Sequence, residues 1–513
     1  MRILGLSGMF HDASATMIED GKILFAGHAE RYSREKNDPY INKQLMKEAC
    51  QYGLPDVIVL HESSKLKNKR RFWQLTWSSI KAAFTEPTME DWLKKFYPQF
   101  KGIPVTNCLH HQSHAAAGML TVPHDWNDAT IVTIDAIGEK QTATISSWQK
   151  NQRILLRHEV NFPNSLGLFY SAVTKAVGLK PMEDEYILMG MAAYGEPVYK
   201  TKMEIHLFDT PADDLHNCLK TIDMSKGLPK SFMSEEALQD KQVQFDLAAS
   251  AQAVVEERIF NYCKLAFKYT GSTNLVYQGG VALNCVANSK LYDIYKNIWV
   301  MPNPGDAGSS LGAAALYYFE QTGNFVDWQG PYLGTEIEGK WPTNKFLDSL
   351  RKGDIFGVAN GKAEFGPRAL GNRSLFADAR GTEIKDKVNA IKRRQEFRPF
   401  APIVLEEHAR DWFDMPGGVI NSPYMSFVCK CLKPDEIPAV VHADGTSRVQ
   451  TVNRNQHPEL YHAMRQWHAE TGCPVVLNTS LNIKGQPIVN LSLIHISEPT
   501  RQEAISYAVF CLK

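Results

Sequence analysis

The sequence lacks the cysteine spacing of a zinc ribbon or a disulfide scaffold. Its nine cysteines are scattered along 513 residues, no CxxC pair occurs, and the closest two are Cys429 and Cys431. Proteins stabilised by disulfides or structural zinc carry closely spaced cysteine pairs. We therefore expect free thiols and a cytoplasmic location, where thiols stay reduced.

Long apolar runs and an excess of one charge are missing as well. No run approaches the roughly 20 apolar residues that span a bilayer. The opening stretch MRILGLSGMF is followed directly by His11 and Asp12, so the apolar run is too short for the core of a signal peptide. Basic and acidic residues balance at 56 each, whereas proteins that bind nucleic acids carry basic surfaces. We expect neither a membrane nor a nucleic acid as partner.

The strand pattern near the start of the chain recurs later. RILGLSG, ASATMIED and GKILFAGHAER read as three strands, the last two joined by an Asp20-Gly21 turn. ATIVTIDAIGE, KQTATISSWQ and RILLRHEV repeat this plan between residues 129 and 160. Helical stretches follow, including FDLAASAQAVVEERIFNYCKLAFKYT and SSLGAAALYYFEQTG. The pattern predicts an internally duplicated α/β domain.

The length of the chain favours two or more domains. The Gly- and Pro-rich stretch DWQGPYLGTEIEGKWPT, residues 327–343, has the composition of a linker. We therefore expect one domain over residues 1–335 and a second over residues 345–490, where Arg-rich loops alternate with short strands.

The last 23 residues have the sequence of a translated sequencing adapter. LSLIHISEPTR and ISYAVFCL are the translations of a common transposase adapter and of the index-flanking segment that follows it. We interpret residues 491–513 as a non-native tail and exclude them from reasoning about fold and function. The natural second domain is then expected to continue beyond Asn490, so that it is C-terminally truncated here.

Three histidines cluster in NCLHHQSHAA. His110 and His114 are four residues apart, so on a helix both side chains lie on one face. Neutral imidazoles bind Zn, Fe, Ni or Cu, and carboxylates complete such sites. Asp135 follows an apolar strand, and Asp306 precedes a helix in PNPGDAGSSLGAA. The pattern indicates a metal site, and the alternative is a set of surface or capping side chains.

An apolar strand ends at Gly279-Gly280 in LVYQGGVALNCVAN, and a helix is expected after it. Glycines let backbone N–H groups approach a phosphate, and a helix N-terminus favours anions. These two glycines and the nearby Asn284 are therefore candidate nucleotide-binding residues. A simple tight turn is the competing interpretation.

Basic residues are concentrated in the loops of the second domain. Arginine forks bind phosphate and carboxylate groups with two parallel hydrogen bonds. This concentration predicts a site for a small polyanion, and the alternative is a solvated basic surface. The candidate binding residues are Arg368, Arg373, Lys392, Arg394, Arg398, His442, Arg448, Ser480 and Asn482.

Taken together and in order, the motifs resemble the NodU/CmcH/TobZ-type O-carbamoyltransferases. The resemblance runs from Met1 to Asn490 and rests on HDASA, HHQSHAA, IDAIGE, MGMAAYGEP, GGVALNC, GDAGSSLGAA, EFGPRALGNRS, FRPFAP, HADGTSRVQ and NTSLNIKGQPIV. It implies a Kae1-like domain of the duplicated actin/hexokinase ATPase class, followed by an α+β YrdC-like domain.

The resemblance also implies a reaction in two steps. The YrdC-like domain would form carbamoyl-adenylate from carbamoyl phosphate and Mg2+-bound ATP, with Lys392, Arg398 and Arg448 as catalytic residues. The Kae1-like domain would then pass the carbamoyl group to a hydroxyl of a small-molecule acceptor, a sugar or a natural product. A homodimer is compatible with this organisation.

The same resemblance assigns the metal, usually iron as Fe2+, to His110, His114, Asp135 and Asp306. His111 is then the spare member of the histidine cluster. His11 and Asp12 are candidate catalytic residues. His11 is our candidate base for the acceptor hydroxyl, because the pKa of a histidine lies near neutral pH. The alternative is a structural His11 that is hydrogen-bonded to Asp12.

Three positions depart from the family pattern. Ala136 occupies a position that is usually glycine, and it fits if its φ is negative. Ile187 stands where a lysine is usual, which removes a charge. Leu481 stands where phenylalanine is common, which we interpret as a packing change.

Other functions use related folds. Threonylcarbamoyl transfer to tRNA would need an RNA-binding surface, which the balanced charge disfavours. A hydrogenase-maturation carbamoyltransferase would add zinc-finger cysteines, which this sequence lacks. The non-enzyme alternative is a nucleotide-sensing module that binds ATP without turnover. The candidate ligands retained in both domains argue against it, whereas Ala136 and Ile187 leave it open.

Overall fold

The computed structural model describes residues 1–73, 81–82, 85–122, 125–214, 227–395, 397–490 and 508–512. The chain forms two compact units. The first comprises Met1–Ala29 and Asn37–Trp328, and the second comprises Glu30–Lys36 and Gln329–Lys513. The sequence-based domain bounds, 1–335 and 345–490, stay a prediction. The compact units divide between Trp328 and Gln329, and residues 30–36 group with the second unit.

The first sheet of unit 1 has the order β3-β2-β1-β4-β5. Strands β1 to β3 form an antiparallel meander, and β4 and β5 add to β1 in parallel. The β2–β3 turn has Asp20 and Gly21 at positive φ, as the sequence predicts. The strands are β1 (Arg2–Ser7), β2 (Ser14–Glu19), β3 (Lys22–His28), β4 (Val57–Leu60) and β5 (Val105–Asn107).

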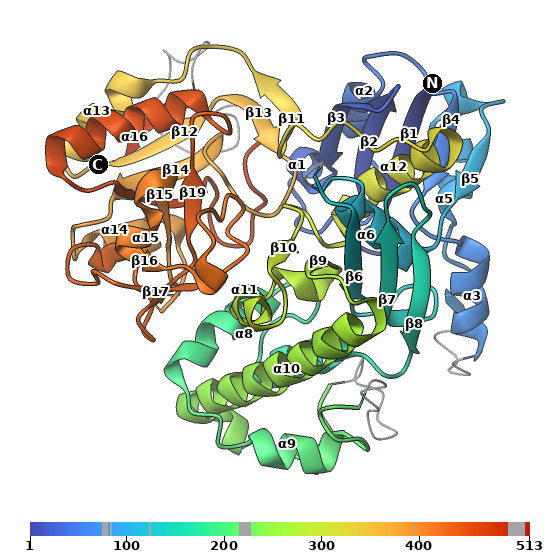
Figure 1. Ribbon diagram of the computed structural model, residues 1–513, viewed down its shortest axis with the longest axis horizontal. Helices are drawn as coiled ribbons and strands as arrows, with labels where there is room; N and C mark the ends of the chain where they lie inside the picture. Colours follow the sequence, from blue (N-terminus) through green and yellow to red (C-terminus); the bar gives the residue numbers. More distant parts are fainter. Residues whose placement is uncertain are drawn as a thin grey trace. The chain divides into compact units, whose positions relative to one another are not determined.

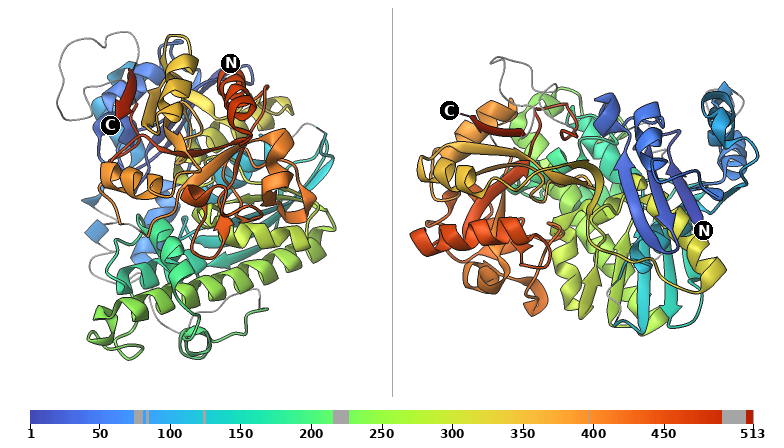
Figure 2. Two further views of the ribbon diagram at one scale, coloured as in Figure 1. Left: turned by 90° about the vertical axis from the view of Figure 1, so that its left-hand side faces the viewer. Right: turned by 90° about the horizontal axis from the view of Figure 1, so that it is seen from above.

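The second sheet repeats this connectivity with the order β10-β9-β6-β7-β8. Again a three-strand meander carries two parallel strands next to its first strand. The meanders are blue and teal in Figures 1 and 2. The duplicated strand plan expected for this part of the chain is therefore present. The strands are β6 (Asp128–Ile134), β7 (Gln141–Gln149), β8 (Leu155–Asn161), β9 (Asn274–Gln278) and β10 (Asn297–Trp299).

The helices of unit 1 include both of the helical stretches expected from the sequence. Asp240 caps the longest helix by accepting a hydrogen bond from the backbone N–H of Gln242, and Gly271 ends it in the left-handed conformation. The helices are α2 (Lys43–Ala49), α3 (Ser64–Trp73), α5 (Met89–Phe96), α6 (His110–Met119), α7 (Leu166–Ala176), α8 (Glu185–Met191), α9 (Lys200–Leu207), α10 (Lys241–Thr270), α11 (Cys285–Lys290) and α12 (Ser309–Thr322).

Helix α12 packs against both α6 and β1 through glycines. A Cβ on Gly312 would lie 1.8 Å from the carbonyl oxygen of Ser113 in α6. A Cβ on Gly5 in β1 would lie 1.9 Å from the carbonyl oxygen of Ser310 in α12. Only residues without a side chain allow backbones to approach this closely. The position of α6, which carries the histidine cluster, is thus fixed by backbone contact with α12.

Unit 2 is built on a mixed sheet with the order β19-β15-β20-β14-β12-β21. One cluster of buried side chains includes Phe346, Phe356, Phe376 and Trp467. The elements of the unit are α1 (Glu30–Ser33), β11 (Tyr332–Ile337), α13 (Thr343–Arg351), β12 (Ile355–Ala359), β13 (Gly361–Glu364), β14 (Arg373–Asp378), α14 (Ile384–Lys392), β15 (Ala401–Leu405), α15 (Ala409–Trp412), β16 (Phe413–Asp414), β17 (Cys429–Cys431), β18 (Thr446–Ser447), β19 (Gln450–Val452), α16 (Pro458–Thr471), β20 (Val475–Ser480) and β21 (Ala508–Leu512).

The structure has strands in two stretches that the sequence analysis assigned to a linker and to a non-native tail. The expected linker, residues 327–343, contains β11, which pairs with β13. In the tail, residues 491–507 and 513 lie outside the described residues, and β21 pairs with β12 in antiparallel register. The adapter origin of this tail stays a prediction.

Within the described ranges, the structure has no helix whose length and apolar content would let it cross a membrane.

The glycine contact between α12 and α6 predicts a large effect for Gly312→Ala. The added methyl group must push the helices apart, which should lower the free energy of unfolding by about 1–3 kcal/mol or more. Gln321→Ala, at an exposed position of the same helix, is the matched control and should leave stability nearly unchanged. Urea denaturation of both variants measures the difference. Equal stabilities would contradict the close packing.

Candidate functional site

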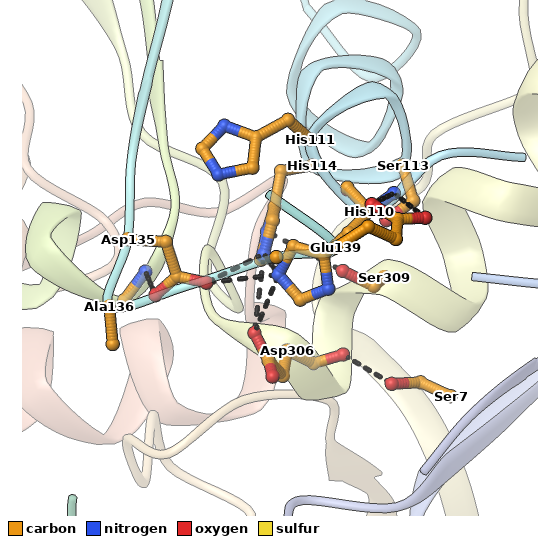
Figure 3. Close-up of polar contacts among 12 residues, drawn as sticks. Ser7, His110, His111, Ser113, His114, Asp135, Ala136, Glu139, Asp306 and Ser309 are labelled. Carbon is orange, nitrogen blue, oxygen red and sulfur yellow. Dashed lines mark hydrogen bonds and ion pairs between the residues drawn. The ribbon is translucent and has the colours of Figure 1, made fainter. Parts of the chain in front are cut away.

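The four predicted metal ligands meet at one place in unit 1. His110 and His114 lie one turn apart on α6, Asp135 directly follows β6, and Asp306 opens a short turn before α12. One ligand atom from each lies within 4.8 Å of those of the other three. The four side chains point toward one another in Figure 3. The duplicated sheets account for this, because carboxylates at strand ends and α6 converge at the same edge.

The distances between donor atoms are short and similar. His110 Nε2 lies 3.0 Å from Asp135 Oδ2 and 3.1 Å from His114 Nε2. His114 Nε2 lies 3.2 Å from Asp306 Oδ1 and 3.3 Å from Asp135 Oδ2. Ligands about 2.1 Å from one ion lie about 3.0–3.4 Å apart at octahedral or tetrahedral angles. The donor set therefore fits a divalent transition metal, and two imidazoles with two carboxylates suit Fe2+ or Zn2+.

Buried charges dominate the electrostatics of this cluster. Burial alone would lower the pKa of His114, but hydrogen bonds to Asp135 and Asp306 outweigh it and raise the pKa to about 9. The pKa of Asp306 falls to about 2, because nearby imidazoles outweigh burial and the charge of Asp135. The pKa of Asp135 is likewise lowered. In the metal-free protein, a protonated His114 thus offsets part of the charge of the two buried carboxylates.

His111 is not a member of the donor set. Its ring turns away from the cluster in Figure 3, and its Nδ1 lies 3.3 Å from Thr144 Oγ1. Burial and the neighbouring histidines lower its pKa to about 3, which keeps the ring neutral. His61 is a histidine that the sequence analysis did not select. Its ring centroid lies 5.5 Å from that of His110, and burial lowers its pKa to about 4.

Glu139 holds His110 in place and was also missed. Its carboxylate accepts hydrogen bonds from the backbone N–H of His110, at 3.0 and 3.2 Å, and from that of Ser63, at 2.9 Å. It is 3% exposed. A carboxylate at the start of a helix satisfies free N–H groups and interacts well with the helix dipole. Its position in IDAIGE, directly after Gly138, gave no signal of this long-range cap.

His11 lies beside the cluster, as expected for a group that acts on the acceptor. Its Nε2 is 3.5 Å from Asp306 Oδ2, and its Nδ1 is 2.9 Å from Asp12 Oδ2. Burial would lower the pKa of His11, but Asp306 and Asp12 raise it to about 10. The hydrogen bond that the structural interpretation requires is therefore present. In the metal-free protein the ring is protonated at neutral pH.

Gly279 and Gly280 pack against the Asp135 strand. Gly279 has φ +91°, and a Cβ there would lie 2.2 Å from the carbonyl oxygen of Ile134. The N–H of Gly280 donates to Asp135 Oδ1 at 3.1 Å, so this N–H orients a predicted metal ligand. Asn284 caps α11, and its amide exchanges hydrogen bonds with Gln252. The oxygen and the nitrogen of the Asn284 side-chain amide both make hydrogen bonds within the protein, which favours a structural role over nucleotide binding.

In unit 2, Lys392, Ser480 and Asn482 form one cluster. Lys392 Nζ donates to the Asn482 side chain at 2.9 Å, to the Asn482 carbonyl at 3.0 Å and to the carbonyl of Ser480. Ser480 Oγ donates to Asn482 Oδ1 at 2.7 Å. Burial, together with the charges of Arg394 and Arg398, lowers the pKa of Lys392. Two predicted arginines are therefore close enough to affect the lysine.

The remaining predicted residues of unit 2 differ in their surroundings. Arg394 donates to Asn389 and stacks on Phe400 at 4.1 Å. Burial lowers the pKa of His442 to about 4, with the nearby charge of Arg448 acting in the same direction. Arg368 lies half-buried in the loop before β14.

Arg373 has a different position from the other arginines. It is fully buried, and its guanidinium donates to the carbonyls of Thr335, Asn360, Gly361, Asn372 and Asn490. Its donors are thus taken up by the backbone, which favours a structural role over substrate binding.

Family models match both parts of the chain. Residues 2–315 match the carbamoyltransferase N-terminus, and residues 347–506 match the carbamoyltransferase C-terminus. The chain belongs to the carbamoyltransferase family. It is therefore a transferase enzyme, as the resemblance in the motifs implies.

Sequence similarity to two relatives extends over nearly the full length of the carbamoyltransferase. The uncharacterized protein sll1178 of Synechocystis is 34% identical, over 95% of this chain and 92% of its own. The 3'-hydroxymethylcephem-O-carbamoyltransferase of Amycolatopsis lactamdurans is 27% identical, over 94% and 93%. Among solved structures, full-length HypF in its phosphate- and nucleotide-bound form overlaps 64% of this chain and 47% of its own. Its identity is 14% and its TM-score 0.34.

The structure accommodates the three residues that depart from the family pattern. Ala136 is not among the residues with positive φ, so its methyl group causes no backbone strain there. Ile187 is buried on α8, and Leu481 is buried in the core of unit 2. The expected packing role of Leu481 is confirmed.

The donor set predicts that His114→Ala abolishes metal binding. Loss of one of four ligands should weaken the affinity of the carbamoyltransferase for Fe2+ or Zn2+ by at least about 100-fold. His111→Gln is the matched control, because His111 lies on the same helix outside the donor set. Equilibrium dialysis measures both. Wild-type affinity in His114→Ala would exclude the proposed ligand.

The pKa of His114 predicts how metal affinity changes with pH. Below about 9 the ring must lose a proton before it binds a cation, so affinity should rise about tenfold per pH unit between pH 6.5 and 9. The raised pKa has the opposite effect on metal-free stability. That contribution is complete below about pH 6.5 and is lost as the pH rises through about 9. Dialysis at several pH values tests this, and a flat profile would contradict it.

Proposed function

We propose that the chain is an ATP-dependent O-carbamoyltransferase that works in two steps. In the first, carbamoyl phosphate, ATP and water give carbamoyl-adenylate, pyrophosphate and phosphate. In the second, an acceptor hydroxyl oxygen attacks the carbamoyl carbon, the bond to AMP breaks, and the hydroxyl proton is removed. The observation that carries this proposal is the presence of two polar sites of different chemistry, one in each compact unit.

The unit 2 site supports the first step. Lys392 is buried among oxygen acceptors, with Arg394 and Arg398 close enough to lower its pKa. A polyanion such as ATP with Mg2+, or carbamoyl phosphate, would interact favourably with these cations and restore the lysine charge. We propose that Lys392, Arg398 and Arg448 are catalytic residues that contact the reacting phosphate and carbamoyl groups. Ser480 and Asn482 would bind and orient the substrate.

The unit 1 site supports the second step. A metal held by His110, His114, Asp135 and Asp306 would supply Lewis-acid polarisation of a bound oxygen. His11 lies beside Asp306 and is the proposed base for the acceptor hydroxyl. Its pKa of about 10 results from the charges of Asp306 and Asp12. A divalent cation would offset those charges, so that the ring could release its proton near neutral pH.

The acceptor is proposed to be a hydroxyl of a sugar or a natural product. The name of the Amycolatopsis relative gives a hydroxymethyl group on a cephem as its acceptor. Carbamoyl-adenylate is easily hydrolysed, so transfer to the acceptor needs a site that excludes water. The burial of the four ligand side chains, which are at most 10% exposed, supports this proposal.

The first step predicts pyrophosphate release that depends on carbamoyl phosphate. The purified protein is incubated with ATP and Mg2+, with or without carbamoyl phosphate and with no acceptor. Release only in the presence of carbamoyl phosphate is the expected result. If the folded protein binds ATP but shows no such release, the adenylate mechanism is wrong and nucleotide sensing becomes the better description.

The two units predict separable defects. His110→Ala combined with His114→Ala should retain pyrophosphate release, because both residues lie in unit 1. Lys392→Ala should lower release by about 100-fold or more, because it removes the buried cation that would contact the polyanion. Thermal unfolding of both variants checks that they are folded. Loss of pyrophosphate release in the folded histidine variant would contradict the assignment of the two steps to different units.

A further inference from the structure

The segment Glu30–Lys36 is far from the second domain in sequence but belongs to unit 2. Two contacts hold it there. Tyr32 Oη and Thr335 Oγ1 are 2.9 Å apart, and Arg31 Nη2 donates to the carbonyl of Gly366 at 3.0 Å. Arg31 is 3% exposed. The segment is therefore held just before Arg34 by two side chains that reach residues about 300 positions away.

Arg34 has an unusual backbone for an arginine. It ends α1 by donating its N–H to the carbonyl of Glu30 at 3.0 Å, and its φ is +68°. Glycine adopts this left-handed conformation at no steric cost, whereas a side chain is strained there. Strained residues persist where the surrounding structure holds them, often at functional sites. The presence of an arginine here, in place of an unstrained glycine, therefore points to a role for its side chain.

That side chain leads to the Lys392 site through a chain of hydrogen bonds. Arg34 Nη2 donates to Gln486 Oε1 at 2.7 Å. The carbonyl of the same Gln486 accepts from Asn482 Nδ2 at 2.7 Å. Asn482 Oδ1 then accepts from Lys392 Nζ at 2.9 Å and from Ser480 Oγ at 2.7 Å. Arg34 therefore holds the residue that decides which way the Asn482 amide faces.

We propose that Arg34 is a positioning residue for the unit 2 anion site. By fixing Gln486, it keeps Asn482 Oδ1 directed at Lys392 and Ser480, and thereby keeps the lysine aligned for the anion. This inference rests on the proposed function only for the identity of the reaction. The arrangement itself would orient Lys392 toward any phosphate-containing ligand.

The geometry explains why a small change would matter. Lys392 has three N–H groups, and they donate hydrogen bonds to oxygen atoms of Ser480 and Asn482. If Gln486 shifts, the Asn482 amide loses the carbonyl that its Nδ2 contacts and can rotate. A misplacement of about 1 Å in a catalytic group can lower a rate by about 100-fold. Effects on turnover should therefore exceed effects on stability.

Arg34→Gly tests the inference, because glycine removes both the side chain and the backbone strain. A merely structural role predicts a lower Tm with unchanged activity. A positioning role predicts an unchanged or higher Tm with carbamoyl-phosphate-dependent pyrophosphate release lowered at least tenfold, through a lower kcat and a higher KM. Asn151→Gly is the matched control. It relieves the same kind of strain, φ +65°, in the exposed β7–β8 turn of unit 1.

A second variant covers the case in which Arg34→Gly does not fold. Gln486→Leu removes the acceptor of the Arg34 hydrogen bond while the backbone carbonyl remains. Its defect should be similar, and in the double variant the two defects should not multiply, because both remove one interaction. Arg34→Lys, which can still donate to Gln486, should recover part of the activity. Independent defects in the double variant, or activity within twofold of wild type in either single variant, would overturn the proposal.

Binding measurements separate this inference from the proposed reaction. Titration calorimetry with inorganic phosphate and with Mg2+-ATP should show weaker binding in Arg34→Gly than in Asn151→Gly. If the wild type binds these ligands but does not release pyrophosphate, the proposed function fails while the positioning role can still be seen in binding. Equal affinities in the two variants, or no binding by the wild type, would overturn the positioning role itself.

Discussion

The structure of unit 1 depends on keeping two buried carboxylates next to each other. Asp135 and Asp306 both face the same pair of imidazoles, and neither is more than 9% exposed. Like charges that are removed from water repel strongly, so this arrangement persists only with compensating positive charge. A protonated His114 provides part of it, and a divalent cation would provide more. The contact of α12 with α6, the Glu139 cap and the Gly280 N–H all hold groups of this cluster at fixed positions.

Unit 2 meets a related constraint with the opposite sign. Lys392 is buried beside two arginines, and oxygen atoms of Ser480 and Asn482 surround its ammonium group. Neutral acceptors satisfy the hydrogen-bonding capacity of a cation but do not cancel its charge. The proposed anion would offset this cluster of basic groups. On the proposed function, the site of unit 1 would bind a cation and the site of unit 2 a polyanion.

Local patterns predicted the features that depend on neighbouring residues. The four-residue spacing of His110 and His114, with Asp135 after a strand and Asp306 before a helix, indicated a metal site, and the family resemblance assigned the four ligands. The alternation of strands predicted the repeated meander. Glu139, His61 and the true surroundings of Arg373 and Asn284 were not predictable in this way. Their roles depend on partners tens to more than a hundred residues away, such as Ser63 for Glu139 and Asn490 for Arg373. A basic or amide side chain in a loop has the same local pattern whether it binds a ligand or supports a backbone.

The location of Glu30–Lys36 limits how this chain can be divided. Strand β3 of the first sheet runs directly into a segment that folds with residues beyond 328. A fragment cut at the main boundary would leave Arg31, Tyr32 and Arg34 on the wrong piece. Neither half would then carry its complete set of interactions. Although it has two compact units, the molecule is not a pair of separable modules, and an exchange of its C-terminal half with that of a relative would have to carry these seven N-terminal residues along.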